Sequence, residues 1–230
     1  MESAIERVGR EAVELSRANR DRGINTTGKP SAASMKAEAR ARAERVSAAR
    51  GVPKEQWGVT FETFDLAGAS QMRTAKAKVM ELVSNKPTTH GVLLSGSWGC
   101  GKTHLAYAAC NYCRERGWPF MFVRAVDVSK RLREAIRADS RGDRDSLSAD
   151  QWLGVYSGEF LLVIDDLGAQ QQTEYSEASL FDIIDRRYRL HHPTIITTNL
   201  PPSQLDGRIA SRFAQGTVIC ASEDKRSKYG

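Results

Sequence analysis

An apolar run that leads directly into a glycine-rich loop constrains the fold more than any other feature of the sequence. Residues 91–106 read GVLLSGSWGCGKTHLA, and GSWGCGKT within them fits the pattern G-x-x-x-x-G-K-[ST]. Such loops bind phosphate because their backbone N–H groups point inward and the following helix presents its positive N-terminus to the same anion. The order of strand, loop and helix signals therefore favours a phosphate-binding loop over a plain turn.

The loop predicts ATP and Mg²⁺ as cofactors. We expect Lys102 to reach the β- and γ-phosphates and the Thr103 hydroxyl to ligate Mg²⁺. The residues predicted to surround the nucleotide are Gly96, Ser97, Trp98, Gly99, Cys100, Gly101, Lys102, Thr103 and His104.

Two adjacent carboxylates, Asp165 and Asp166, end the apolar run LLVIDDLG at residues 161–168. Asp165 suits the metal, and Asp166 suits the orientation of an attacking water. A turn or a helix cap is the alternative interpretation of the pair. Together with the glycine loop, the pair predicts that the chain binds and hydrolyses ATP.

Short apolar runs alternate with helical stretches from residue 59 onward. The runs span residues 91–96, 119–125, 160–166, 193–199 and 216–221. This alternation predicts an α/β fold with a parallel five-stranded sheet flanked by helices on both faces. A chain of 230 residues accommodates one such core and an appendage.

Residues 1–58 differ in composition from the rest. They hold twelve Lys and Arg against eight Asp and Glu, with few large apolar side chains. Helical spacing of apolar residues near the start, and alanine and arginine enrichment in residues 31–50, predict a small helical N-terminal region. These helices either dock on the main domain or, as we favour, form a basic arm that folds against another protein. The predicted domains are thus residues 1–58 and 59–230.

Polar residues with potential roles follow the later strands. Asn199 ends the run TIITTN, where an amide could contact the γ-phosphate or position water; an Asx turn before two prolines is the alternative. Arg208 and Arg212 lie four residues apart in GRIASRF, so a helix presents both on one face. Their guanidinium groups suit the γ-phosphate of a neighbouring subunit, and solvated surface arginines are the alternative.

The cysteines and the hydropathy limit other functions. Cys110 and Cys113 form a C-x-x-C, but without a second ligand pair we favour ordinary helix packing over a metal or redox site. No apolar run approaches the roughly 20 residues that span a bilayer, and the first 15 residues lack a signal-peptide pattern. We expect a cytoplasmic protein with reduced thiols and no membrane partner.

Residues 59–230 resemble the AAA+ ATPases of the bacterial replicative helicase loader group, the DnaC/DnaI type, with the IstB-type transposition ATPases close to them. The resemblance is carried by GSWGCGKTHLA, LLVIDDLG, LFDIIDRRYRLHHPTIITTNLPP and GRIASRF, in that order. The segment FETFD at residues 61–65 is similar to a loader segment and favours the loaders.

The resemblance implies a P-loop AAA+ (ASCE) fold and a role for each matching residue. Asp165 and Asp166 would be the Walker B pair, Asn199 the sensor 1 residue, and Arg212 a trans-acting arginine finger with Arg208 beside it. Many AAA+ proteins have Asp-Glu where this chain has Asp-Asp, and the shorter side chain would hold the attacking water less well, although the aspartate pair is common among the loaders and their IstB relatives. Only 18 residues follow Arg212, so we expect no C-terminal lid, and Arg226 is only a weak candidate for a second sensor.

A basic segment precedes the third strand. Residues 124–144 hold seven basic and four acidic residues, and they resemble the helical insertion through which loaders touch single-stranded DNA. The predicted DNA-binding residues are Lys130, Arg131, Arg133 and Arg137, which would follow consecutive phosphates in a sequence-tolerant manner. A solvated helix is the alternative, although the net charge of +6 also favours an anionic partner.

The resemblance implies a loader that assembles with ATP, binds the replicative hexameric DNA helicase through its N-terminal arm and helps to place it on single-stranded DNA. One alternative is an IstB-like transposition helper that recruits a transposase on duplex DNA. The other is a helicase regulator that binds ATP without hydrolysing it.

Overall fold

The computed structural model describes residues 51–64, 70–84, 90–142, 146–158, 161–168 and 174–220. The helices predicted within residues 1–50, and Arg226, lie outside the described residues.

Five parallel strands form the central sheet, in the order β2-β3-β4-β1-β5. The strands are β1 (Gly91–Gly96), β2 (Phe120–Arg124), β3 (Leu161–Leu167), β4 (Thr194–Thr198) and β5 (Thr217–Cys220). The predicted parallel five-stranded sheet is confirmed, and the predicted ends of each strand differ from the observed ends by at most one residue. Near-continuous apolar runs form these strands because helices cover both faces of the sheet.

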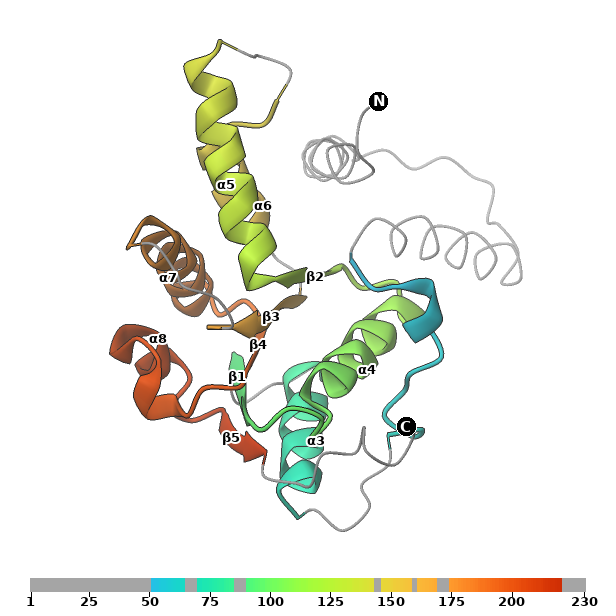
Figure 1. The fold of residues 1–230 in the computed structure, drawn as a ribbon. Coiled ribbons are helices and arrows are strands. Elements are labelled where there is room, and N and C mark those ends of the chain that lie inside the picture. The colour runs from blue at the N-terminus through green and yellow to red at the C-terminus, as the bar shows by residue number, and fades with distance from the viewer. Residues whose placement is uncertain are drawn as a thin grey trace, which may run out of the picture.

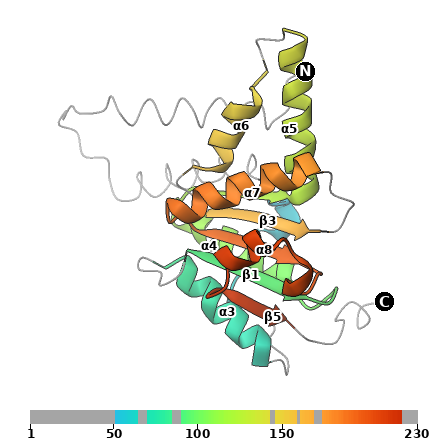
Figure 2. The same cartoon turned by 90° about the vertical axis from the view of Figure 1, so that its left-hand side faces the viewer.

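The helices divide between the two faces (Figures 1 and 2). One face carries α3 (Ser70–Leu82) and α4 (Lys102–Glu115), and the other carries α5 (Ala125–Ser140), α6 (Ala149–Tyr156), α7 (Glu174–Arg189) and α8 (Gly207–Arg212). Short 3₁₀ turns span Lys54–Gln56 and Pro202–Gln204. Each face holds its own hydrophobic core: the first core lies between the sheet and helices α3 and α4, and the second lies between the sheet and helices α5 to α8. The side chains of β1 alternate between them, because Val92 and Leu94 belong to the first core and Leu93 belongs to the second.

Helices α5 and α6 lie together and extend past the sheet in both ribbon views (Figures 1 and 2). A capping box begins α6: the Gln151 backbone N–H donates to the Ser148 hydroxyl, and the Ser148 N–H donates to the Gln151 side chain. The buried rings of Trp152 and Tyr156 then join α6 to the second core.

Residues 51–58, assigned above to the N-terminal arm, pack against α4. The Asn111 side chain, 1% exposed, donates to the backbone oxygens of Gln56 and Val59, each at 2.7 Å. Val52 belongs to the first core, and the Arg114 guanidinium donates to the Trp57 oxygen at 2.8 Å. The segment just before the predicted boundary at residue 58 therefore packs on the main domain. The division into two domains stays a prediction.

The four cysteines are buried free thiols. Cys110 and Cys113 lie within α4, and burial raises the pKa of both. Across the described ranges, no group of three or more His, Cys, Asp or Glu side chains could hold a metal ion. Across the same ranges, no helix has the length and apolar character needed to cross a membrane.

Candidate nucleotide-binding site

Two glycines give the loop after β1 its shape. Gly96 ends the strand opposite Cys220, and a Cβ atom there would lie 2.0 Å from the Cys220 backbone oxygen. Gly101 precedes α4 with φ +99°, a left-handed conformation that favours glycine, and a Cβ atom there would lie 3.2 Å from the Phe64 ring. Side chains at these positions would push the loop away from β5 and from Phe64.

Lys102 lies inside the loop, with 6% of its surface exposed. Its ammonium group donates to the backbone oxygens of Gly96 and Ser97, each at 2.8 Å, and to Asn199 Oδ1 at 2.9 Å. The charge that we expect to meet the β- and γ-phosphates is therefore held at the centre of the loop.

The remaining loop side chains point in different directions. Ser97, Trp98 and His104 are exposed, Trp98 to 65%. Cys100 is buried, and a hydrogen bond from the Cys220 thiol lowers its pKa. The predicted contacts of residues 96–101 with phosphate would thus be made by their backbone N–H groups.

Asp165 is buried beside two hydroxyl groups. Thr103 Oγ1 donates to Asp165 Oδ1 at 2.9 Å, and Thr197 Oγ1 donates to the same oxygen at 2.6 Å. Burial raises the pKa of Asp165, and the two hydroxyl donors oppose that rise. Magnesium in nucleotide sites takes one or two protein oxygens and completes its octahedron with water and phosphate. The Thr103 and Asp165 oxygens fit that requirement.

The Asp166 side chain contacts Asn199 instead of Thr103. Its φ of +59° is left-handed, and the β3–β4 pairing shifts register between Ile164 and Leu167. The Asp166 N–H donates to Thr197 Oγ1 at 2.9 Å, which stabilises this conformation. Consecutive carboxylates therefore occupy different environments, one buried at Thr103 and one exposed to solvent.

Asn199 joins the two halves of the site. Its Oδ1 accepts from Lys102 Nζ and its Nδ2 donates to Asp166 Oδ1, both at 2.9 Å. Strands β1, β4 and β3 are neighbours in the sheet, which brings these residues together although about 100 positions separate the first from the last. Sequence analysis did not select Thr197; its signal was a polar residue in a buried apolar strand, two positions before Asn199.

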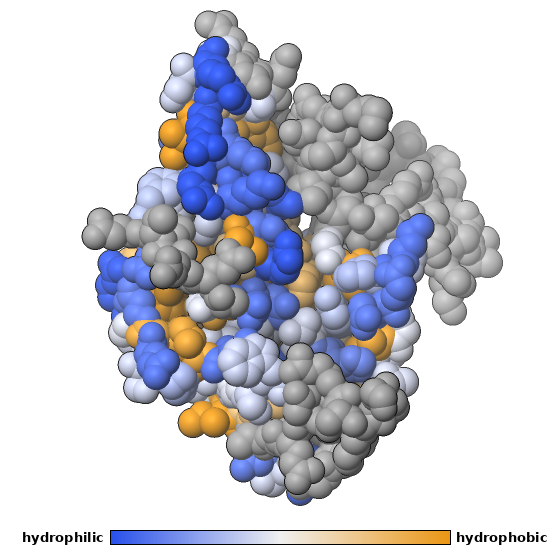
Figure 3. Space-filling view, in the orientation of Figure 1, coloured by the Kyte–Doolittle hydropathy of each residue, from blue (hydrophilic) through white to orange (hydrophobic). Residues whose placement is uncertain are grey.

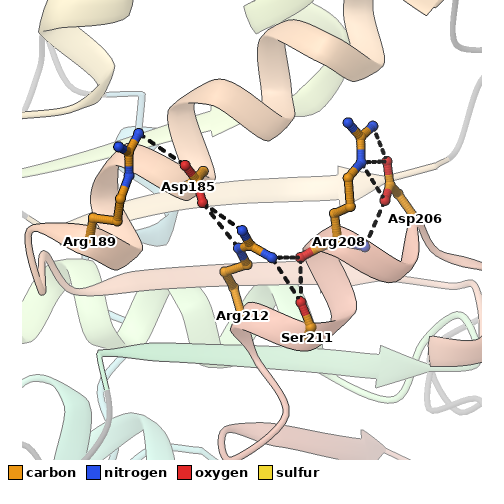
Figure 4. Close-up of polar contacts among 6 residues, drawn as sticks. All are labelled: Asp185, Arg189, Asp206, Arg208, Ser211 and Arg212. Atoms are coloured by element: carbon orange, nitrogen blue, oxygen red, sulfur yellow. Dashed lines mark hydrogen bonds and ion pairs between the residues drawn. The ribbon is translucent and has the colours of Figure 1, made fainter.

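Arg208 and Arg212 lie on α8 and bind carboxylates of their own chain (Figure 4). Arg208 pairs with Asp206, with 2.6 Å between Nη2 and Oδ2, and Arg212 pairs with Asp185, with 2.8 Å between Nη2 and Oδ1. Within the described part of the chain, neither arginine contacts the glycine loop.

The four predicted DNA-binding residues do not share one face of α5. Lys130, Arg133 and Arg137 are exposed, and their spacing places them on one face. Arg131 points instead toward α6, where it donates to the Tyr156 hydroxyl at 3.3 Å and lies 5.5 Å from the centre of the Trp152 ring. Figure 3 shows hydrophilic side chains along α5.

Residues 33–212 match the family model described as IstB-like ATP binding protein. The chain belongs to this family. Among curated members of the wider group, the replicative helicase loader DnaC of Escherichia coli K12 is 30% identical over 143 residues, covering 61% of this chain and 55% of DnaC. The ATP-binding protein of insertion sequence IS5376 from Geobacillus stearothermophilus is 31% identical over 140 residues, covering 61% of this chain and 52% of that protein.

Solved structures of AAA+ proteins share the fold of this IstB-like chain. The replication initiator DnaA bound to AMPPCP and single-stranded DNA superimposes with a TM-score of 0.60 at 25% identity, covering 73% of this chain and 51% of DnaA. The DnaC helicase loader superimposes with a TM-score of 0.59 at 23% identity, covering 74% of this chain and all of that structure. The resemblance to the helicase loader group and to IstB-type ATPases, and with it the P-loop AAA+ fold, is confirmed. The chain spans about half the length of the curated relatives it matches.

Proposed function

We propose that this chain is an ATP-hydrolysing loader that binds a replicative DNA helicase and helps to place it on single-stranded DNA. The observation that carries the ATP-driven part is the position of Asn199, which contacts both Lys102 and Asp166 at 2.9 Å. One amide thus connects the residue proposed to hold the γ-phosphate with the residue proposed to orient the attacking water. A change at the phosphate would alter both contacts, which suits a switch.

Each part of the site has a separate task in the proposed reaction. Lys102 would hold the phosphate oxygens, and Thr103 and Asp165 would hold Mg²⁺, which supplies charge neutralisation between the β- and γ-phosphates. Asp166, exposed and oriented by Asn199, would position water in line with the γ-phosphate. Arg212 of a neighbouring subunit would complete the site from outside.

The loader role is supported by the relatives and by α5. DnaC is by name a replicative helicase loader, and the DnaA structure contains single-stranded DNA. Helix α5 extends past the sheet (Figure 1), and its exposed residues Lys130, Arg133 and Arg137 offer consecutive positive charges to a DNA backbone. The basic arm at residues 1–58 is our candidate for the helicase contact.

The arm hypothesis is tested with the complete chain. Purified protein and a chain lacking residues 1–50 are each mixed with a hexameric replicative helicase, and complexes are separated by size. We expect only the complete chain to retain the helicase, while both bind ATP. Equal retention by the shortened chain would assign the helicase contact to another surface.

A transposition helper is the second candidate, because the IS5376 relative is as similar to this chain as DnaC is. The two functions differ in DNA substrate and in partner. Preference for duplex over single-stranded DNA, together with retention of a transposase instead of a helicase, would favour the second candidate.

The α5 face gives a prediction about DNA. The double change Arg133→Ala and Arg137→Ala removes two proposed phosphate contacts. We expect affinity for single-stranded DNA to fall about tenfold or more, and the slope of log K against log salt to become shallower by about one to one and a half. Fluorescence anisotropy with labelled oligonucleotide at several salt concentrations measures both.

Arg73→Ala together with Arg116→Ala is the matched control, because it removes the same charge from exposed positions on α3 and at the end of α4, away from α5. An equal loss of affinity in the control would mean that the loss in the α5 variant comes from the lower net charge and not from a contact made by α5. An unchanged affinity in the α5 variant would exclude this face as the DNA contact.

A further inference from the structure

The structure connects Arg212 to a carboxylate that sequence reasoning did not select. Arg212 Nε and Nη2 both donate to Asp185 Oδ1, at 3.1 Å and 2.8 Å. Nη1 of the same guanidinium donates to the Arg208 backbone oxygen at 3.2 Å and to Ser211 Oγ at 3.0 Å. Asp185 lies on α7 and Arg212 on α8, so the ion pair crosses between two packed helices (Figure 4).

Asp185 also binds a second arginine. Arg189, one turn further along α7, places Nη2 3.0 Å from Asp185 Oδ2. The hydrogen bond from Arg212 and the charges of both arginines lower the pKa of Asp185, which is therefore ionised at neutral pH. The group of one carboxylate and two guanidiniums carries a net charge of +1, so it remains attractive to a phosphate.

Aromatic rings restrict the Arg212 side chain further. Its guanidinium carbon lies 5.2 Å from the centre of the Phe181 ring and 5.9 Å from the centre of the Tyr188 ring. The side chain is nevertheless 28% exposed, so part of the guanidinium faces solvent. The arginine is thus held in one orientation and remains accessible from outside the subunit.

We propose that Asp185 is a positioning residue, which fixes the Arg212 guanidinium in the orientation in which it meets the triphosphate bound to the neighbouring subunit. This inference rests on the proposed function of Arg212 as an arginine finger. A free arginine side chain loses rotamer freedom when it is immobilised at an interface, whereas one already held by Asp185, Ser211 and two rings loses little. Asp185 therefore acts through Arg212 and does not itself touch the nucleotide.

Mixed assemblies test the proposal, because they separate the subunit that hydrolyses ATP from the subunit that supplies the arginine. Arg212→Ala subunits keep a complete loop but supply no arginine. Asp166→Asn subunits supply Arg212 but do not hydrolyse. Each should be nearly inactive alone, and we expect the mixture to regain ATP hydrolysis at the contacts where an Arg212→Ala loop faces an intact Arg212.

The change Asp185→Asn is then placed in one partner at a time. In the Asp166→Asn partner it should lower the kcat of the mixture about tenfold with little change in KM, because the arginine that meets the transition state is no longer fixed. In the Arg212→Ala partner it should change neither, because that subunit supplies no arginine. A general folding defect would lower activity from either position.

Asp182→Asn is the matched control. Asp182 lies one turn earlier on α7 and pairs with Arg186 through Nη2 and Oδ2 at 3.0 Å, an exposed ion pair with no contact to Arg212. Asp182→Asn, placed in either partner, should leave the kcat and KM of the mixture unchanged. The positioning role would be overturned, and the arginine finger kept, by either of two results. One is an equal fall in kcat whichever partner carries Asp185→Asn, and the other is a higher kcat of the mixture when the Asp166→Asn partner carries it. A mixture without any regained activity would overturn the finger and the positioning role together.

Discussion

Asp166→Asn should keep ATP bound while hydrolysis falls about a hundredfold to ten-thousandfold. Lys102, Thr103 and Asp165 hold the phosphates and the metal in our proposal, and the substitution touches none of them. Asparagine tolerates the left-handed backbone found at this position, with φ +59°, and its amide oxygen can still accept from Asn199. The lost property is the negative charge that orients the attacking water.

Phosphate release in single-turnover conditions and the binding of a fluorescent ATP analogue measure the two effects separately. Asp182→Asn provides the same chemical change on the exposed side of α7 and should alter neither. Asp165→Asn should instead weaken nucleotide binding in the presence of Mg²⁺, because it removes a proposed metal ligand. Full hydrolysis by Asp166→Asn would show that another group orients the water.

Arg187→Met should lower the free energy of unfolding by about 3 to 5 kcal/mol. The Arg187 guanidinium is completely buried and donates to the backbone oxygens of Tyr156, Gly158 and Pro193 at 2.8 to 2.9 Å, and to Thr194 Oγ1 at 2.9 Å. Burial lowers its pKa to about 9, which leaves it charged at neutral pH. Methionine fills much of the volume but leaves these buried acceptors without their donors.

Urea unfolding followed by circular dichroism measures this loss. Arg186→Met is the matched control, because the neighbouring side chain is 44% exposed and forms a surface ion pair with Asp182. We expect that control to lie within about 0.5 kcal/mol of the unchanged chain. Similar losses from both substitutions would mean that the buried contacts of Arg187 contribute little to stability.

The sheet and the glycine loop could be predicted because their signals are local. A buried parallel strand needs an apolar run, and a phosphate loop needs glycines at fixed spacing, so residues 91–106 predict one strand and the loop without reference to the rest of the chain, and four further apolar runs predict the other strands. Asp165 and Asn199 could be placed near the loop because both end apolar strands, and parallel strands end at the same edge of the sheet.

Asp185 and the orientation of Arg131 could not be predicted in the same way. The contact of Asp185 with Arg212 depends on how α7 packs against α8, and 27 positions separate the two residues. Arg131 lies in a basic run, and only the packing of α6 against α5 shows that it turns toward Tyr156. Both contacts belong to tertiary packing, which periodicity within one helix does not specify.

Arg187 is an intermediate case, because a signal was present but ambiguous. It lies in the run DRRYR, which is typical of a solvated helix end. Yet Leu180, Ile183 and Ile184 are buried, and the same helical spacing continues to position 187. The apolar stripe thus places position 187 on the buried face of α7, whereas a charged side chain is more often exposed to solvent. Arg187 is buried because backbone carbonyl groups accept hydrogen bonds from its guanidinium group.

Asp185 and Arg187 are only two residues apart, on opposite sides of α7. Asp185 holds α8, and Arg187 holds the carbonyl groups of Tyr156 and Gly158 at the end of α6. Both residues belong to one turn of α7, and the backbone hydrogen bonds of the helix resist their relative movement. A displacement of α8 that moves Asp185 should therefore move Arg187 as well, so helix α7 connects the proposed arginine finger to the base of the α5–α6 pair.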